Sequence, residues 1–269
     1  MKVAGVLAWY KAQQFNPGWG SLWINPFFLI RRDLYRALSG MAQRIRGGAM
    51  LDFGCGAKPY RHLFEVDEYI GLDMENPGHS HRTEEVDVYY DGRNIPFPEH
   101  RFDAVLASEV MEHVFEPQLI LAELHRVMKP GALALFTVPF AWNEHEMPHD
   151  YARYSQGGFE ALLRSSGFEI VQSVKTNRFT RTWFQMGILG WYQLWQTPNK
   201  YANILLSIPL LGPLNITAWF LSELMPGSAS WYCNTVVLAR TPGSVLPGSV
   251  LPGPVSPGSM PPGSPTYAV

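Results

Sequence analysis

The chain has 269 residues, of which 46% are hydrophobic and 16% are charged, and its formal net charge is -2. The hydrophobic fraction is enough for a substantial core, whereas the charge balance gives no basic face, so we expect no nucleic-acid partner. The two cysteines, Cys55 and Cys233, are too few and too far apart for a disulfide framework. The apolar start "VAGVLAWY" lacks a cleavage pattern, and we therefore expect a cytoplasmic protein.

Residues 1–45 are rich in aromatic side chains, and the stretch "INPFFLIRRDLYRALSGMAQRI" is expected to form an amphipathic helix. We treat 1–45 as an N-terminal helical segment that precedes a main domain over 46–240. Seven strands are predicted in that domain, at 49–53, 69–73, 86–91, 102–110, 132–140, 168–174 and 231–240.

Helices separate several of these strands. Pro117 stands in the first turn of one, and Pro130-Gly131 is expected to stop it. Ser155 is suited to cap a second helix, which Gly167 ends. The alternation of strands and helices predicts an α/β fold with a mainly parallel sheet and helices on both faces. Such sheets bind ligands at the carboxyl ends of their strands.

An apolar insertion over 177–230 interrupts the pattern before the last strand. Its stretch "ANILLSIPLLGPLNITAWFLS" has nearly the length needed to cross a bilayer, but Pro209, Gly212 and Pro213 are expected to interrupt it. We expect 183–222 to form a lid or a homodimer interface over the ligand edge, and peripheral membrane contact is the alternative. The residues 241–269 repeat Pro-Gly every five positions and are predicted to be a disordered tail.

The stretch "LDFGCG" ends the first predicted strand with an acid and two glycines, Asp52, Gly54 and Gly56. Glycines at these positions let the backbone turn sharply and let a ligand approach without a Cβ in the way. A helix expected after the loop would offer free N–H groups to that ligand. Pro59 stands where a dinucleotide fingerprint has its third glycine, which disfavours a diphosphate and hence a nicotinamide-dependent oxidoreductase.

Further acids follow at the ends of the next strands. Asp73 lies seventeen residues after Gly56 and is placed to accept ribose hydroxyls, and Asp91, followed by Gly92, could accept from an exocyclic amine of adenine. Each acid alone is more often a solvated loop residue. Three in succession favour a nucleoside site.

These motifs, with "GLDME", "DGRNIPFPEHRFDAVLASEVMEHV" and "ELHRVMKPGALALFTVPF", resemble the class I S-adenosylmethionine-dependent methyltransferases, and methyltransferase type 11 in particular. The resemblance implies a doubly wound, Rossmann-like, seven-stranded sheet and S-adenosyl-L-methionine as cofactor. It implies these cofactor-binding residues: Asp52, Gly54 and Gly56 at the methionine part, Asp73 at the ribose, Asp91 and Gly92 at adenine, and Ser108 and Glu109 beside the reacting centre. Many relatives carry another glycine where this chain has "AKPY".

The loop after the fifth predicted strand, "FAWNEHEMPHDYARYS", is expected to supply the acceptor chemistry. His149 is our first candidate for a general base, oriented by Asp150 or Glu146, and His145 is the second. The alternative for Asp150 is a surface ion pair with Arg153. The spacing of His145 and His149 suits metal ligands, but a third ligand is lacking, so no metal is expected. His113 is interpreted as a packing residue.

Together these features predict an enzyme that transfers a methyl group to a small-molecule, glycan or lipid-linked acceptor, at oxygen. The alternative is a catalytically silent methyltransferase fold that serves as a scaffold or a membrane-associated subunit.

Overall fold

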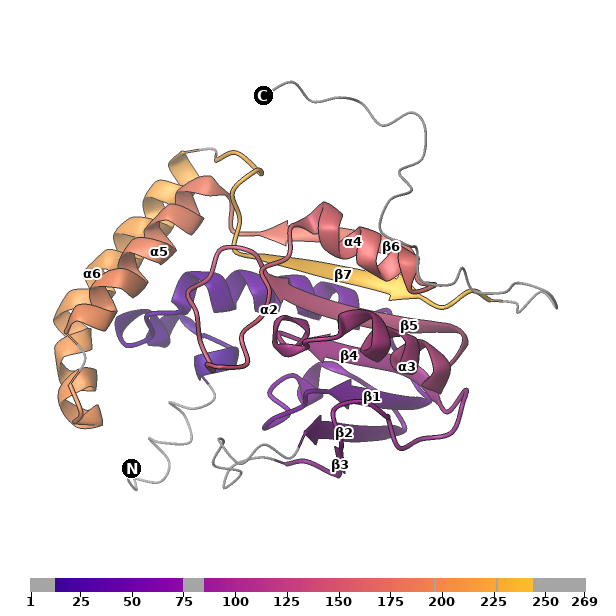
Figure 1. The fold of residues 1–269 in the computed structure, drawn as a ribbon. Helices are drawn as coiled ribbons and strands as arrows, with labels where there is room; N and C mark the ends of the chain where they lie inside the picture. The colour runs from indigo at the N-terminus through magenta and orange to yellow at the C-terminus, as the bar shows by residue number, and fades with distance from the viewer. Residues whose placement is uncertain (1–12, 75–84, 196, 226, 244–269) are drawn as a thin grey trace.

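The computed structural model describes residues 13–74, 85–195, 197–225 and 227–243 (Figure 1). Seven strands form one sheet: β1 (Ala49–Phe53), β2 (Glu68–Met74), β3 (Val88–Tyr90), β4 (Phe102–Ser108), β5 (Met128–Pro139), β6 (Glu169–Thr176) and β7 (Asn234–Arg240). Their order is β3-β2-β1-β4-β5-β7-β6. The strands β1 to β5 pair in parallel, whereas β7 is antiparallel to both β5 and β6. The predicted α/β fold with a mainly parallel sheet is confirmed.

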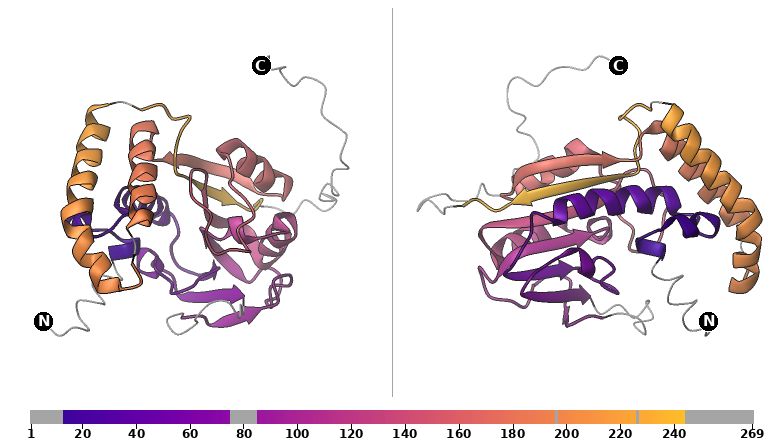
Figure 2. Two further views of the ribbon diagram at one scale, coloured as in Figure 1. Left: turned by 60° about the vertical axis from the view of Figure 1, so that its left-hand side comes forward. Right: turned by 180° about the vertical axis from the view of Figure 1, so that it is seen from behind.

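Helices cover both faces of the sheet (Figure 2). On one face lie α3 (Pro117–Val127) and α4 (Gln156–Ser165), whose apolar side chains share a core with Leu51, Phe53 and Phe136. On the other face lies α2 (Phe28–Ala42), which packs on Met50, Leu106 and neighbouring side chains. Alternate residues of β1 therefore serve opposite cores, as the two-residue period of a strand requires.

Local sequence explains where these helices begin and end. Pro117 occupies the first turn of α3, where its missing N–H removes no helical hydrogen bond. The Ser155 hydroxyl accepts a hydrogen bond from the Gly158 N–H at 3.2 Å and so caps α4, and Gly167 follows with φ +90°. The helix α3 ends at Val127, before Pro130-Gly131, because the backbone already pairs with β4 from Met128.

The helix expected after the glycine loop is wrong: a single 3-10 turn, η2 (Arg61–Leu63), stands in its place. Only residues 57–67 connect the loop to β2, and Lys58, with φ +48°, precedes a proline that disfavours helical backbone. Tyr60 and Phe64 from this short connection are buried beneath α2.

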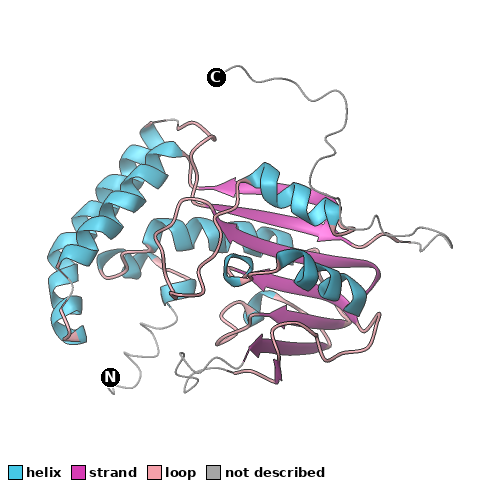
Figure 3. Ribbon diagram, viewed as in Figure 1, coloured by secondary structure: helices cyan, strands magenta, loops and turns pink. Residues whose placement is uncertain are grey.

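The insertion forms a helical hairpin of α5 (Phe179–Leu194) and α6 (Lys200–Leu224). The hairpin follows the carboxyl end of β6 and stands at the end of the sheet where the parallel strands finish (Figures 1 and 3). It packs on the 3-10 turn η1 (Trp19–Trp23) and on the start of α2, in a separate apolar cluster. The predicted insertion and the predicted N-terminal segment therefore cover one another.

Buried polar groups fix this contact. Arg181 of α5 forms two hydrogen bonds with the Asp33 carboxylate of α2, at 2.7 and 2.8 Å. Gln185 accepts from the Ile30 N–H and donates to the Pro26 carbonyl, and it is fully buried. Such satisfied buried groups stabilise one docking geometry, because any shift would leave them without partners.

Against the sequence expectation, α6 runs through Pro209 and Pro213 as one helix. A Cβ on its Gly212 would lie 2.0 Å from the Trp23 ring, so this glycine permits the close approach of α6 to η1. The contact supplies packing that offsets the helical hydrogen bonds lost at the prolines.

Within the described ranges, no helix has both the length and the hydropathy that a bilayer crossing requires. The predicted tail falls almost wholly in 244–269, outside the described residues.

Candidate active site

A cavity of about 500 Å³ opens at the carboxyl ends of β1 to β4. This volume lies in the range usual for small-molecule and cofactor sites. It is lined by seven of the ten predicted site residues: Gly54, Gly56, Asp73, Asp91, Gly92, Glu109 and His149. Asp52, Ser108 and His145 are not among its lining residues. Parallel strands thus bring together residues from 54 to 149 along the sequence.

The glycine loop forms the inner wall because its backbone adopts left-handed conformations. Gly54 has φ +68°, and a Cβ there would lie 2.3 Å from Val110 Cγ2. Gly56 has φ +47°, and no atom lies within 4 Å of the position its Cβ would take. Only glycine fits the first position without strain, and the second leaves open space against bare backbone.

Acids at the carboxyl end of β2 and directly after β3 organise the cavity wall. The Asp73 carboxylate accepts from the Gly56 N–H and from the Met74 N–H, each at 2.8 Å, and so holds the glycine loop against β2. Asp91 accepts from the backbone N–H groups of Arg93 and Asn94 and from the Asn94 side chain. The backbone and side-chain hydrogen bonds from Asn94 lower the pKa of Asp91 to about 2.

Asp52 lies on the other side of the sheet from the cavity. It shares the side of Met50, not that of Leu51 and Phe53, and its carboxylate accepts from the Tyr69 hydroxyl at 2.6 Å. Burial raises the pKa of Asp52 to about 7, although the hydrogen bond from Tyr69 opposes this. The structure therefore places Asp52 behind the loop, where it contacts the sheet and not the cavity.

Glu109 directly follows β4, is half-buried and has φ +52°. Its carboxylate accepts from the Thr137 hydroxyl at 2.8 Å and from the Asn234 amide at 2.7 Å, and its backbone N–H donates to Thr137. Burial raises the pKa of Glu109. The neighbouring Ser108 hydroxyl lies 3.0 Å from the same Thr137 oxygen. Ser108 therefore contacts Glu109 indirectly, through the hydroxyl of Thr137.

The loop between β5 and α4 covers the cavity, and its charged groups differ from the predicted arrangement. His149 is exposed and its Nδ1 lies 2.9 Å from the Tyr151 hydroxyl, which is its hydrogen-bond partner in place of Asp150 or Glu146. Asp150 instead forms a bidentate ion pair with Arg153, which lowers the pKa of Asp150 well below its usual range. The alternative prediction of an Asp150–Arg153 pair is the correct one, and its carboxylate is buried.

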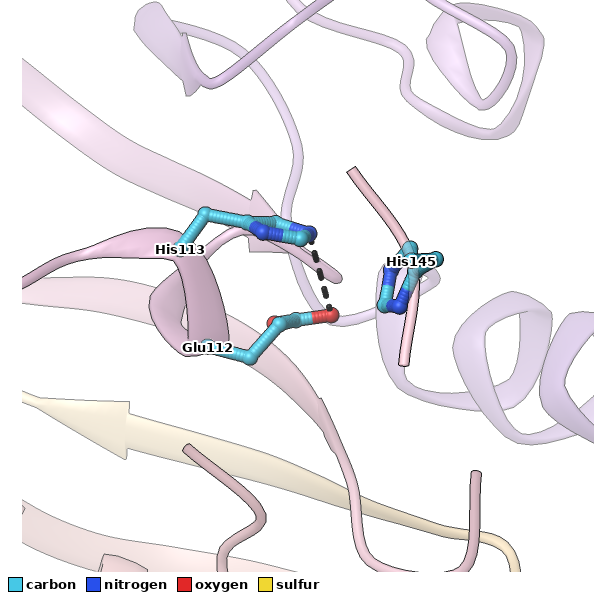
Figure 4. Close-up of side chains that lie close together, drawn as sticks. All are labelled: Glu112, His113 and His145. Carbon is cyan, nitrogen blue, oxygen red and sulfur yellow. Dashed lines mark ion pairs between the residues drawn. The ribbon is translucent and has the colours of Figure 1, made fainter. Parts of the chain in front are cut away.

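His145 faces a different set of partners: Glu112 and His113 of the 3-10 turn η4 (Met111–His113) (Figure 4). The two imidazoles meet edge to face, with ring centroids 4.7 Å apart. The Glu112 side chain is fully buried, and burial, with a contribution from the Glu109 carboxylate, raises the pKa of Glu112 well above its usual range. Burial and the neighbouring His113 lower the pKa of His145.

Sequence reasoning missed Glu112 as a site residue and interpreted His113 as packing, although His113 lines the cavity. One signal was available: Glu109 and Glu112 are three residues apart after a buried strand, which places both carboxyls in one turn. Glu112, His113 and His145 form one cluster. His145 joins it from the loop after β5, and no local sequence pattern predicts the course of that loop.

Comparison with known proteins agrees with this geometry. Residues 51–136 match a family model described as a methyltransferase domain. A fatty-acid O-methyltransferase of Mycolicibacterium smegmatis is 28% identical over 156 residues, which cover 54% of this chain and 56% of that protein. An uncharacterized methyltransferase of Mycobacterium avium is 33% identical over 131 residues, covering 44% and 51%. The chain thus spans about half the length of the curated relatives it matches.

Two solved structures share the fold. The [4+2]-cyclase SpnF superposes with a TM-score of 0.51 at 21% identity, covering 79% of this chain and 82% of that one. A chain from the complex between the Haloferax volcanii Trm112 methyltransferase activator and a methyltransferase gives 0.50 at 15% identity, covering 81% and 92%. At such identities these likenesses concern the fold alone.

The sheet order and the glycine-lined cavity define a Rossmann-like α/β protein with a nucleoside-type site at its strand ends. The family match then identifies it further. Residues 51–136 carry a methyltransferase domain, and this match together with the relatives named as methyltransferases supports the class I S-adenosylmethionine-dependent methyltransferase family.

Proposed function

We propose that this protein is a methyltransferase that uses S-adenosyl-L-methionine to methylate an oxygen of a small-molecule, glycan or lipid-linked acceptor. The observation that carries the proposal is the cavity itself, in which the glycine loop, Asp73, the Asp91–Gly92 turn and Glu109 face one space. The family model covers this part of the chain.

The residues present fit the cofactor. Open space at Gly56 lets an amino-acid group lie against bare backbone, and Asp73 offers carboxylate oxygens to ribose hydroxyls. Met74, Tyr90 and Ile120 provide apolar walls suited to a purine ring. The bound cofactor supplies an activated methyl group on a sulfonium. The chain has to hold the acceptor oxygen in line with that methyl group, and alignment of this kind supplies much of the rate.

Proton removal from a hydroxyl acceptor falls to His149. Its ring lines the cavity and is held by Tyr151, and it is exposed enough to exchange a proton with water. A base within hydrogen-bond reach contributes typically 10²–10⁴-fold to such a step. A carboxylate acceptor would make this base dispensable, because it is already ionised at neutral pH.

An apolar acceptor is favoured by the surface beside the site. The hairpin carries exposed apolar side chains on both helices, including Trp183, Trp191, Leu194, Phe220 and Leu224. Between Arg181 and Glu223 the sequence has one charged residue, Lys200. The relative named as a fatty-acid O-methyltransferase supports the same class of acceptor. We include peripheral contact with a lipid surface through 183–222 in the proposal.

Calorimetric titration with S-adenosylhomocysteine tests the cofactor assignment first. A single binding event is expected, and its absence would favour the silent-scaffold alternative. Transfer of a tritiated methyl group to fatty acids, extracted lipids, glycans and small metabolites then tests the acceptor. Release of the tritiated methyl group from the lipid pool as methanol on ester hydrolysis, or as a methyl halide on ether cleavage, supports transfer to oxygen, whereas a label that resists both points to nitrogen or carbon.

The matched variants are His149→Ala and His62→Ala. The first should lower turnover about 10²-fold with S-adenosylhomocysteine affinity unchanged. The second alters a histidine on η2 that contacts Tyr35, outside the cavity lining, and should leave turnover unchanged. Equal turnover of wild type and His149→Ala on a hydroxyl acceptor would remove His149 as the base.

A further inference from the structure

We propose that Glu112, His113 and His145 bind a divalent transition-metal cation at the inner side of the cavity. Each residue offers one ligand atom, and these atoms lie within 4.8 Å of one another (Figure 4). Ligand atoms around a cation with bonds of about 2.0–2.2 Å lie roughly 3 to 4 Å apart, so the three side chains have to close by about 1 Å. All three lie outside α-helices and strands, Glu112 and His113 on the 3-10 turn η4 and His145 on the loop after β5, which permits this movement.

The hydrogen bonds around the two rings prepare them as ligands. Nδ1 of His113 lies 2.8 Å from the His149 carbonyl, which can only accept, so Nδ1 carries the proton. Nδ1 of His145 lies 3.3 Å from the Asn143 carbonyl and 3.3 Å from an Asp150 oxygen, two acceptors that fix the same tautomer. The Arg153 guanidinium, 3.5 Å away, is already engaged by Asp150.

Both neutral imidazoles therefore keep a lone pair on Nε2. An outer hydrogen bond from the opposite ring nitrogen to a carbonyl or carboxylate is the usual support of a metal-bound histidine. Nε2 of His113 points into the cluster, 3.9 Å from a Glu112 oxygen and 3.7 Å from a Glu146 oxygen. Glu146 lines the cavity and is a candidate for an additional oxygen ligand.

Glu112 supplies an independent observation. Its side chain is 0% exposed, and neither carboxylate oxygen has a hydrogen-bond partner among the described residues. A buried polar group without a partner costs about 1–3 kcal/mol, and an ionised one costs more. The backbone explains why the group is nevertheless kept in place, because the Glu112 carbonyl accepts from the N–H groups of Tyr151 and Ala152. A cation between the carboxylate and the two rings would satisfy it.

The identity of the ligands selects the class of cation. Two imidazoles and one carboxylate suit Mn²⁺, Co²⁺ or Zn²⁺, whereas Mg²⁺ and Ca²⁺ prefer oxygen ligands throughout. Because His113 and Glu146 line the cavity, such a cation would have one side turned to its interior, where it could hold an acceptor oxygen. That last role rests on the proposed function, whereas the binding itself does not.

Metal binding is measured on the full chain, stripped with a chelator and titrated separately with Mn²⁺, Co²⁺, Zn²⁺ and Mg²⁺. Calorimetry should give one transition-metal equivalent per chain, weaker binding of Mg²⁺, and a higher melting temperature with the bound metal. Co²⁺ should develop a visible absorption band that reports the ligand set. Absence of both heat and thermal shift with all three transition metals would overturn the proposal.

The variants Glu112→Gln and His145→Ala should each weaken binding by about 100-fold or more, because each removes a ligand. His149→Ala is the matched control: it removes a histidine from the same loop but not from the cluster, and metal affinity should stay within about threefold of wild type. Wild-type metal affinity in Glu112→Gln or His145→Ala contradicts the site. Should Glu112→Gln fail to fold, His145→Ala alone decides, since its ring is partly exposed.

The same stripped samples are titrated with S-adenosylhomocysteine. Intact S-adenosylhomocysteine binding without metal binding overturns the metal site alone. Metal binding without S-adenosylhomocysteine binding contradicts the proposed function and leaves the metal site standing.

Discussion

Replacing Asp52 by asparagine should stabilise the protein at neutral and alkaline pH. The carboxyl is 3% exposed, and burial raises its pKa from 3.8 to about 7. In the unfolded chain the pKa returns to its ordinary value near 4. Between about pH 4 and pH 7 the folded state therefore binds one proton more than the unfolded state, so stability falls as the pH rises through this window.

The size of the effect follows from the two pKa values. The pKa of Asp52 is about three units higher in the folded than in the unfolded chain, which corresponds to about 4 kcal/mol. Above pH 7 the ionised carboxylate lowers the free energy of unfolding by this amount, and below pH 4 it has no effect. Asparagine keeps an oxygen that accepts from Tyr69 but cannot ionise. The free energy of unfolding of Asp52→Asn, relative to wild type, should therefore rise from near zero at pH 4 to a plateau of several kcal/mol above pH 7.

Urea unfolding at intervals between pH 4 and pH 8 measures this difference directly. Asp103→Asn on the neighbouring strand β4 is the matched control of opposite sign. Burial raises the pKa of Asp103, but hydrogen bonds from Lys129 and from the Ala49 N–H outweigh it and lower the pKa overall. That variant should lose stability above pH 4. A constant offset between Asp52→Asn and wild type across the whole range would refute the reasoning.

Three further outcomes are expected. Gly54→Ala should destabilise the protein by about 1–3 kcal/mol, because it adds strain at φ +68° and a clash with Val110. The control Gly40→Ala in α2 meets no atom within 4 Å and should stabilise the protein slightly. Urea unfolding compares the two variants. Asp73→Asn should weaken S-adenosylhomocysteine binding about 10- to 100-fold by calorimetry, since it removes charge-assisted hydrogen bonds, and unchanged affinity would exclude Asp73 from the ribose. Arg181→Gln should cost about 1.5–3 kcal/mol, because it removes two charge-assisted hydrogen bonds to Asp33, which keeps its hydrogen bond from Asn177. Arg46→Gln, in an exposed pair with Glu65, should cost under about 1 kcal/mol, and equal effects in thermal unfolding would mean that the Arg181 pair does not anchor the hairpin.

The parts of the fold that sequence predicted are those written in local patterns. Strand β1 is the short, fully buried segment "AMLDF". The starts of α3 and α4 are each marked by one residue, Pro117 in the first turn of α3 and Ser155 as the cap of α4. The expected helix after Gly56 failed because the connection to β2 is too short, which depends on where β2 pairs and not on the loop itself. The prediction that the prolines interrupt α6 failed for a similar reason. Their effect is offset by packing on Trp23, which is almost two hundred residues away in sequence.

In the site, too, some residues could be placed from local sequence patterns and others could not. Gly54, Gly56, Asp73 and Asp91 follow consecutive strands, and parallel topology alone brings them to one edge. Asp52 does not line the cavity, because the two-residue period of β1 turns Asp52 and Phe53 to opposite sides, and its contact with the cofactor stays a prediction. The cluster around Glu112 depends on the course of a sixteen-residue loop with no periodic pattern, "FAWNEHEMPHDYARYS", and no sequence rule gives that course.

The contrast between the predictable cofactor wall and the unpredictable loop also concerns the acceptor of the proposed methyl transfer. The matched family model ends at residue 136, so it includes the cofactor wall and Glu112 but excludes His145, His149 and the α5–α6 hairpin. A fold shared with the [4+2]-cyclase SpnF illustrates that the sheet does not fix the reaction. Under the proposed function, we therefore expect acceptor choice to depend on the loop over the cavity and on the α5–α6 hairpin. Substitutions there, such as Trp183→Ala, should change the preferred acceptor while S-adenosylhomocysteine affinity stays constant, whereas substitutions in the glycine loop should weaken binding of the cofactor and slow every acceptor alike.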